Sequence, residues 1–285
     1  MQRPALSRRG LIAGTVGTGF ALAVRPISAA TITTSAEGLD VAEVRIPGPG
    51  GEVPAYTALP GGRPKKPKPP CFLVVHEIFG VHEHIRDDCR RLAKLGFAAI
   101  APDLFARQGD VTKMADQKEI SAKVIAKVPD EQVLSDLDRC VPYLESKGAD
   151  THRVAITGFC WGGRIVWLYA AHTKVARAGV AWYGRLVGDK DPLHPVYPMD
   201  VAATLKAPVL GLYGGTDQGI PVASVEEMRK ALATGGAASK RSRIQVYPDA
   251  GHAFFADYRP SYRAAAADDG WKRMLDWFKE SGVAP

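Results

Sequence analysis

The sequence predicts an α/β fold with a mostly parallel central sheet and helices on both of its faces. Short apolar runs typical of buried strands alternate with helical patterns of about ten residues or more. No proline- or glycine-rich linker divides this array, and 285 residues suffice to bury a core without metal or disulfide support. We therefore expect one domain over residues 31–285.

The elements follow one another in a regular order. The first two strands join through a Pro-Gly turn at residues 47–51, and the basic, proline-rich residues 61–70 predict a surface loop. Strands are expected at residues 41–46, 53–59, 71–75, 97–101, 154–156, 179–183, 209–213 and 244–247. Helices are expected at residues 85–95, 112–127, 130–147, 165–171, 222–232 and 260–282. Gly96 is a typical cap for the first helix.

Residues 1–30 are typical of an export signal. The pair Arg8-Arg9 precedes a mildly apolar stretch from Leu11 to Val24, and small residues, Ser28-Ala29-Ala30, supply a cleavage region. A twin arginine favours the Tat pathway, which carries folded proteins. We expect transient contact with the Tat export machinery and a periplasmic or secreted mature protein. An uncleaved anchor or a cytosolic tail is the alternative.

The charge of the remaining chain is nearly balanced. The net charge is +7, but residues 1–30 hold four arginines and no acid, so 33 basic residues face 30 acidic ones beyond them. This excess is too small to predict binding to nucleic acid or to an anionic membrane. Beyond residue 30 no apolar run approaches the ~20 residues of a membrane helix. We expect a small-molecule substrate and no stable membrane association; the oligomeric state stays open.

A candidate nucleophile lies between a predicted strand and a predicted helix. The residues Gly158-Phe159-Cys160-Trp161-Gly162-Gly163 form the pattern Gly-x-nucleophile-x-Gly, with cysteine where many hydrolases have serine. The nucleophile of such a motif sits on a strained turn, and the flanking glycines let neighbouring backbone pass closely. The helix that begins there favours a thiolate and an oxyanion. A buried structural cysteine is the alternative.

Two further strand ends carry an acid and a base. Asp217 follows the strand at 209–213, and His252 follows the strand at 244–247. Alone, either residue would be typical of a turn or a surface loop. Together with Cys160 they give the chain order nucleophile, acid, base of an α/β-hydrolase. We expect Cys160 to attack a carbonyl, His252 to transfer protons and Asp217 to orient the imidazole.

The strand at 71–75 leads into a fourth polar cluster. A carboxylate at Glu77 could hold or accept the proton of the thiol, and the backbone N–H of Ile78 could join that of Trp161 as an oxyanion donor. A metal site is the alternative, but the spacing of these residues differs from the His-Glu-x-x-His motif of zinc proteases. Its candidate ligands are His76, Glu77, His82 and His84. We expect no metal and no cofactor.

The remaining cysteines and aromatic residues allow more than one role. Cys71 is expected in the core, and a disulfide between Cys89 and Cys140 stays open. Three aromatic residues are expected near the site, as pocket lining or as core: Trp161, Trp182 and Tyr183.

Four segments together resemble the dienelactone hydrolase family. They are residues 76–80, 101–108, 158–163 and 251–254, within a similarity that runs roughly from Val41 to Phe278. Members of this family are α/β-hydrolases that open enol-lactones with a Cys-Asp-His triad. The resemblance implies that Cys160, Asp217 and His252 form this triad. It further implies that Glu77 pairs with the thiol and helps to deprotonate it.

The resemblance also concerns substrate binding. Arg107 matches one of two arginines that bind the substrate carboxylate in the family, whereas the position of the second is Ala256. Arg259, three residues further on, is the candidate substitute. The expected activity is cleavage of a small lactone or carboxylic ester through an acyl-cysteine. The alternatives are a general carboxylesterase or thioesterase and, more distantly, a non-catalytic exported binding protein.

Overall fold

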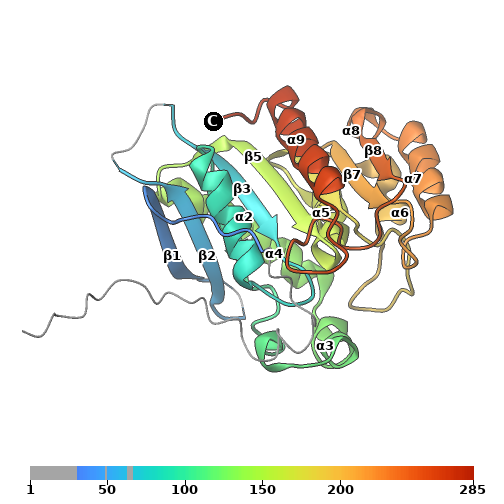
Figure 1. The fold of residues 1–285 in the computed structure, drawn as a ribbon, viewed down its shortest axis with the longest axis horizontal. Helices are drawn as coiled ribbons and strands as arrows, with labels where there is room; N and C mark the ends of the chain where they lie inside the picture. The colour runs from blue at the N-terminus through green and yellow to red at the C-terminus, as the bar shows by residue number, and fades with distance from the viewer. Residues whose placement is uncertain (1–30, 49, 63–66) are drawn as a thin grey trace, which may run out of the picture.

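The structure, a computed structural model, describes residues 31–48, 50–62 and 67–285. The predicted export signal, residues 1–30, lies outside the described residues, as does part of the predicted surface loop at 61–70. The described chain forms an α/β-hydrolase fold around one eight-stranded sheet (Figure 1). Its strands run in the order β1-β2-β4-β3-β5-β6-β7-β8.

Two antiparallel strands border a parallel sheet. The bounds of the strands are β1 Leu39–Ile46, β2 Val53–Pro60, β3 Pro70–Val75, β4 Ala98–Pro102, β5 Asp150–Phe159, β6 Ala176–Trp182, β7 Val209–Gly214 and β8 Arg243–Tyr247. β1 pairs antiparallel with β2, and β2 pairs antiparallel with β4. From β4 to β8 all neighbours are parallel, so the carboxyl ends of these strands meet at one edge. All eight predicted strands are present.

Helices cover both faces of the sheet. Their bounds are α2 Glu83–Lys94, α3 Gln117–Lys123, α4 Asp130–Ser146, α5 Trp161–His172, α6 Pro198–Val201, α7 Val222–Thr234, α8 Ala237–Arg241 and α9 Ala264–Glu280. In Figure 1, α2 and α9 lie in front of the sheet, and α4 and α5 lie behind it. This arrangement buries the central strands on both faces, and every residue of β3, β4 and β7 is buried.

The core links the centre of the sheet to the last helix. Phe72 of β3 lies edge-on to Phe97 and to Phe278 of α9, with ring centroids 5.2 and 4.9 Å apart. Burial of one such side chain stabilises a fold by about 1.5–3 kcal/mol. The indole of Trp277, also on α9, donates a hydrogen bond of 3.1 Å to the carbonyl of Gly179 in β6. α9 therefore holds strands from the middle of the sheet together.

Two predicted helices differ from the structure. The helix expected over 112–127 is broken into the turn Val111–Lys113, α3 and the turn Ile125–Lys127. α3 begins where the carboxylate of Asp116 accepts hydrogen bonds from two backbone N–H groups. The helix expected from residue 260 begins at Ala264, because residues 259–262 form a turn instead. The short helices α6 and α8 lie where no helix was predicted.

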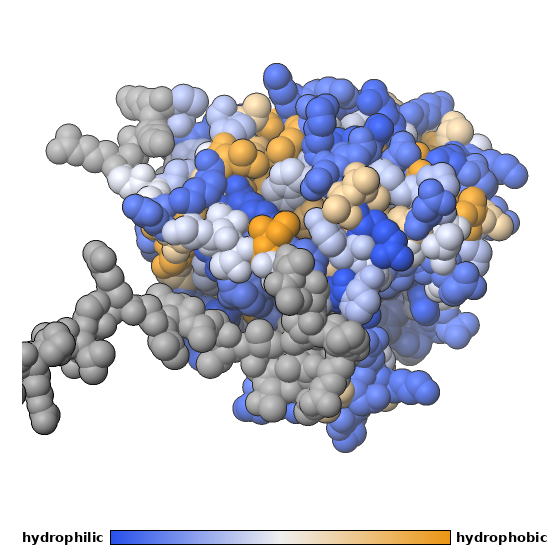
Figure 2. All heavy atoms as spheres, viewed as in Figure 1, coloured by the Kyte–Doolittle hydropathy of each residue, from blue (hydrophilic) through white to orange (hydrophobic). Residues whose placement is uncertain are grey.

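The visible surface is mainly hydrophilic, with small separate apolar areas (Figure 2). Large apolar side chains that are exposed occur singly along the chain, as is ordinary for a folded domain. Among the described residues, no helix has both the length and the apolar character needed to cross a membrane.

Candidate active site

Cys160 lies on the sharp turn between β5 and α5. Its φ of 55° and ψ of −113° are uncommon for a residue with a side chain, at a cost of about 1–3 kcal/mol. The flanking glycines make the turn sterically feasible. A Cβ on Gly158 would lie 2.5 Å from the carbonyl oxygen of Gly162, and a Cβ on Gly162 would lie 2.4 Å from that of Val75. The predicted nucleophile turn is therefore present.

The three residues expected to act together lie in hydrogen-bonding contact. Nε2 of His252 is 3.2 Å from Sγ of Cys160, and Nδ1 of His252 is 2.7 Å from Oδ2 of Asp217. The other oxygen of Asp217 accepts a 2.8 Å hydrogen bond from the N–H of Gly219. Asp217 is only 5% exposed, so its charge acts on His252 with little screening by water. A chain of contacts thus runs from carboxylate through imidazole to sulfur.

The surroundings favour a protonated His252. Burial opposes the charged imidazolium, but the negative sulfur of Cys160 and the carboxylate of Asp217 outweigh it and raise the pKa of His252 to about 10. At neutral pH His252 therefore carries a positive charge, and hydrogen-bonding distance places this charge beside the sulfur of Cys160. A thiolate is the reactive form of cysteine.

The two residues expected to supply oxyanion donors line the cavity together with Cys160. Ile78 follows the end of β3, Trp161 is the first residue of α5, and both line the same cavity as Cys160. Within the described chain, neither N–H donates a hydrogen bond to another backbone group. Both amides thus remain available to a negatively charged oxygen, and the orientation at a helix start favours that charge.

Backbone strain gathers around the same cavity. Within the described chain, the non-glycine residues with positive φ are Cys160, Tyr183 with φ 39° and Ala253 with φ 59°. Tyr183 follows β6, and Ala253 follows His252. Strained backbone of this kind often marks functional sites, because the surrounding structure must hold it in place. Here it occurs in the segments that follow β5, β6 and β8.

A cavity of about 750 Å³ opens above Cys160. Its walls include Trp161, Tyr183 and Ile220 as large side chains. Tyr183 is fully buried, its ring lies 5.2 Å from that of His252, and its hydroxyl lacks a hydrogen-bond partner within the described chain. Trp182 points instead into the core, where its N–H donates to Thr157. Trp161 and Tyr183 are therefore lining residues, and Trp182 is a core residue.

Glu77 lies beneath the site with partners other than Cys160. The hydroxyl of Tyr258 donates a hydrogen bond to its Oε2, and Nε2 of His82 is 3.3 Å from the same oxygen. Burial opposes ionisation, but His82 and the charges of His84 and Arg259 lower the pKa of Glu77 to about 2. Glu77 is thus an ionised carboxylate. Contact between Glu77 and the thiol remains a prediction.

The predicted carboxylate-binding arginines lie outside the cavity lining. The guanidinium of Arg107 donates to the buried carboxylate of Asp136. Arg259 lies over the ring of Phe79, 5.9 Å from its centroid. Ala256, at the family's second arginine position, is fully buried. The structure brings neither Arg107 nor Arg259 to the cavity, and their binding of substrate stays a prediction.

The other three cysteines are buried, free thiols. The disulfide considered between Cys89 and Cys140 is therefore absent from this structure. Burial raises the pKa of Cys71 to about 12 and raises those of Cys89 and Cys140 well above the usual value. They remain protonated and out of contact with solvent, which leaves Cys160 as the accessible thiol.

The described residues contain no group of three or more histidine, cysteine or acidic side chains placed to hold a metal ion. Of the ligands in the metal alternative, Glu77 and His82 are paired with each other. Nδ1 of His76 donates to the carbonyl of Glu77, and Nε2 of His76 accepts from the N–H of Leu104. His84 lies between Asp88 and Asp257. These contacts account for the cluster without a metal.

Sequence reasoning missed part of the cavity wall. Arg164, in the first turn of α5, donates two 2.7 Å hydrogen bonds to Asp130 and a third of 2.9 Å to the carbonyl of Val196. This buried pair ties the irregular segment before α6 to α4 and to the nucleophile helix. Arginine directly after Gly162-Gly163 was the available signal, but its partner is distant in sequence and could not be inferred.

The comparisons with known proteins agree over nearly the whole chain. The sequence model described as "Dienelactone hydrolase family" matches residues 55–282. A protein of Methylorubrum extorquens, whose name gives carboxymethylenebutenolidase as an inferred activity, is 60% identical over 98% of this chain and 94% of its own. A relative from Escherichia coli K12 with the same name is 53% identical over 95% of this chain and 98% of its own.

A solved structure is similarly close. A crystal structure from Klebsiella pneumoniae, named as an inferred dienelactone hydrolase, is 52% identical to this chain. It superposes with a TM-score of 0.81 and covers 85% of this chain and 99% of its own.

Proposed function

Because the chain belongs to the dienelactone hydrolase family, we propose that it hydrolyses a small lactone or carboxylic ester through an acyl-Cys160 intermediate. The observation that supports this most is the unbroken line of contacts from Asp217 through His252 to the sulfur of Cys160. The three residues come from three strand ends, and the cavity opens on the sulfur. A non-catalytic binding protein would not require this alignment.

In the first half of the proposed reaction, the Cys160 thiolate attacks the carbonyl carbon and forms a carbon–sulfur bond. The carbonyl oxygen becomes negative and accepts hydrogen bonds from the N–H groups of Ile78 and Trp161. When the tetrahedral species collapses, the bond to the ester oxygen breaks. His252 gives its proton to that oxygen, so an alcohol leaves, or in a lactone the ring opens.

In the second half, water replaces the alcohol. His252 takes a proton from the water as it attacks the thioester carbon, and the carbon–sulfur bond breaks to return the thiolate. The product is a carboxylic acid. Asp217 keeps Nδ1 of His252 protonated, so that Nε2 faces the sulfur throughout. Tyr183, with its buried hydroxyl free to donate, is proposed to orient the substrate.

A general carboxylesterase or thioesterase is the second candidate. The observation that favours it is that neither candidate arginine lines the cavity, neither Arg107, which the family resemblance implies, nor its proposed companion Arg259. Without these arginines, a preference for an anionic substrate would require another positively charged side chain in the cavity. The catalytic steps would be the same, and the two candidates differ in the substrate alone.

The test is turnover of a dienelactone and of p-nitrophenyl acetate by purified mature protein under reducing conditions. Cys160→Ala is the matched control, because it removes one atom from a side chain that no other thiol can replace. We expect hydrolysis of at least one substrate and loss of activity by several orders of magnitude in Cys160→Ala. Turnover that survives in Cys160→Ala would contradict the proposal. Preference for the dienelactone would favour the lactonase over the general esterase.

A further inference from the structure

The cavity above Cys160 has two arginines in its walls, Arg164 and Arg185. Arg164 is already neutralised, because both of its terminal nitrogens bind the carboxylate of Asp130. Arg185 differs from Arg164 in both its exposure and its lack of an ion-pair partner in the described chain. Arg185 is exposed, and its side chain forms no hydrogen bond or ion pair with any residue of the described chain.

The acids of the cavity wall do not compensate Arg185. Asp217 is bound to His252 and to the N–H of Gly219. Asp191 is paired with His194, whose Nδ1 lies 3.0 Å from its carboxylate. Neither carboxylate is within ion-pair distance of Arg185. The cavity therefore presents one guanidinium whose charge and hydrogen-bond donors are uncommitted.

Arg185 belongs to a segment whose start is bonded to the strands of the site. It follows β6 by three residues, and β6 lies between the strands that carry Cys160 and Asp217. The N–H of Cys160 donates to the carbonyl of Trp182 at the end of β6, and the N–H of Tyr183 donates to Leu212 of β7. The start of the Arg185 segment is thus bonded to both neighbouring strands.

We propose that Arg185 binds a carboxylate of the substrate, and that this chain therefore prefers esters or lactones with a free carboxylate. The proposal rests on the hydrolase function proposed above. Arg185 would supply the cation that neither Ala256 nor the committed Arg107 provides. A guanidinium can bind both carboxylate oxygens at once, which gives orientation as well as affinity.

The test compares two esters that differ only in charge. Mono-p-nitrophenyl succinate carries a carboxylate where p-nitrophenyl butyrate carries a methyl group. We expect Arg185→Gln to lower kcat/KM for the succinyl ester by about tenfold or more and to change that for the butyryl ester by less than about twofold. Arg185→Lys should show a smaller loss, since lysine keeps the positive charge but lacks the paired N–H donors of the guanidinium.

The matched control is Arg177→Gln. This substitution removes the same charge at the opposite end of β6. There, Nε of Arg177 donates a hydrogen bond to the carbonyl of His152. It should leave both esters unaffected. Equal losses for both esters in Arg185→Gln, or an equal loss for the succinyl ester in Arg177→Gln, would overturn the proposal.

A binding measurement separates this proposal from the proposed function. Monoethyl succinate and ethyl butyrate are titrated calorimetrically into Cys160→Ala and into the same protein with Arg185→Gln. If Arg185→Gln weakens the affinity for monoethyl succinate by about tenfold or more and leaves that for ethyl butyrate unchanged, the role of Arg185 is supported. This holds even if the wild-type protein cleaves no ester. Undetectable binding of monoethyl succinate, or equal weakening of both probes, contradicts that role even if the protein proves to be an esterase.

Discussion

At the scale of single residues, the proposed mechanism depends on which atom each side chain of the proposed triad faces. His252 has one nitrogen on Asp217 and the other on Cys160. Because Nδ1 is fixed by a buried carboxylate, the ring is held in one orientation and, whenever it is neutral, in one tautomer. The proposed proton transfer by His252 requires this fixed orientation.

Asp217→Asn tests this orientation. The amide keeps the size of the carboxylate but can donate to Nδ1, which would favour the wrong tautomer. We expect kcat to fall by about three to four orders of magnitude while the melting temperature changes little. Steady-state kinetics and a thermal melt check both parts. A variant with more than half of the wild-type kcat would show that Asp217 has no orienting role.

The contact among Cys160, Asp217 and His252 could be predicted because each residue stands beside a local signal, a strand end followed by glycine. Arg185 and Arg164 could not, because what distinguishes them is whether a partner lies nearby. Asp130, the partner of Arg164, is 34 residues away in sequence. Arg107 matched a family motif, yet its guanidinium faces Asp136. Side-chain pairing over such distances depends on packing that no local pattern records.

At the scale of elements, the turn between β5 and α5 depends on close backbone contact. Gly162 approaches the carbonyl oxygens of Val75 and His76, where a Cβ would lie at 2.4 and 2.6 Å. Both atoms belong to backbone and cannot move aside without displacing β3. The turn that presents Cys160 is thus braced by the neighbouring strand.

Gly162→Ala should therefore distort or unfold the site. We expect a destabilisation of more than about 1 kcal/mol, or loss of soluble protein, and a large loss of activity. Gly236→Ala is the control, because a Cβ there meets no atom within 4 Å and the backbone φ is ordinary. Urea denaturation compares the two variants. Equal stability of both would refute the argument from close approach.

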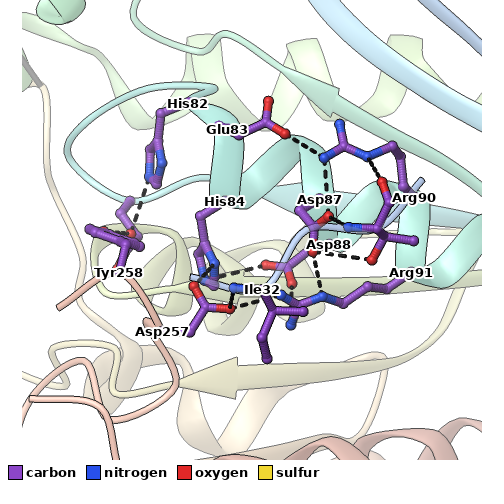
Figure 3. Close-up of polar contacts among 12 residues, drawn as sticks. Ile32, His82, Glu83, His84, Asp87, Asp88, Arg90, Arg91, Asp257 and Tyr258 are labelled. Atoms are coloured by element: carbon purple, nitrogen blue, oxygen red, sulfur yellow. Dashed lines mark hydrogen bonds and ion pairs between the residues drawn. The ribbon is translucent and has the colours of Figure 1, made fainter. Parts of the chain in front are cut away.

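Helix α2 carries a buried network of charges that the mechanism does not use (Figure 3). His84 lies 3.1 Å from Asp257 and 3.7 Å from Asp88, while Arg91 binds both Asp87 and Asp257. Asp257 follows the site loop, so this network fixes the segment after His252 to α2. Burial opposes the charged form of His84, but Asp88 and Asp257 outweigh it and raise its pKa to about 9.

This pKa predicts a pH-dependent stability. Since the pKa in the folded state exceeds that of the unfolded chain, His84 stabilises the fold fully below pH 6.5, and the contribution is lost as pH rises through about 9. Its size is at most about 3 kcal/mol. Urea denaturation at pH 6 and pH 9 should show a smaller difference in His84→Gln than in wild type. An unchanged difference would show that His84 does not titrate as the structure implies.

Elements were predictable in proportion to their regularity. The apolar runs identified every strand, because a parallel sheet buried on both faces leaves little choice of residue. The segment at 112–127 has a helical pattern, yet the carboxylate of Asp116 starts α3 only at residue 117. Capping by one side chain decides where a helix begins, and periodicity does not reveal it.

At the scale of the whole molecule, the order of the strands explains the site. β5, β6, β7 and β8 are successive parallel neighbours, so the residues that follow them emerge at one edge. Cys160, Tyr183, Asp217 and His252 follow these four strands in turn. The chain order of the motifs therefore suffices to predict their meeting, once the sheet is parallel.

Export by the twin-arginine route is a proposal at this scale, since residues 1–30 lie outside the described part of the chain. The replacement of Arg8 and Arg9 by lysine should retain the precursor in the cytoplasm of a bacterium with the Tat pathway. Cell fractionation with immunoblotting of the full-length chain checks this. Periplasmic protein in undiminished amount would refute the Tat assignment while leaving the fold and the site unaffected.

The central claim is that Cys160 carries the acyl group, and the most direct test is to find that group. Protein is mixed with p-nitrophenyl acetate, quenched in acid within a turnover, digested and examined by mass spectrometry. The account predicts one acetyl group on the peptide that contains Cys160, and none in Cys160→Ala. An acetyl group on another residue, or steady turnover with Cys160 always unmodified, would contradict it.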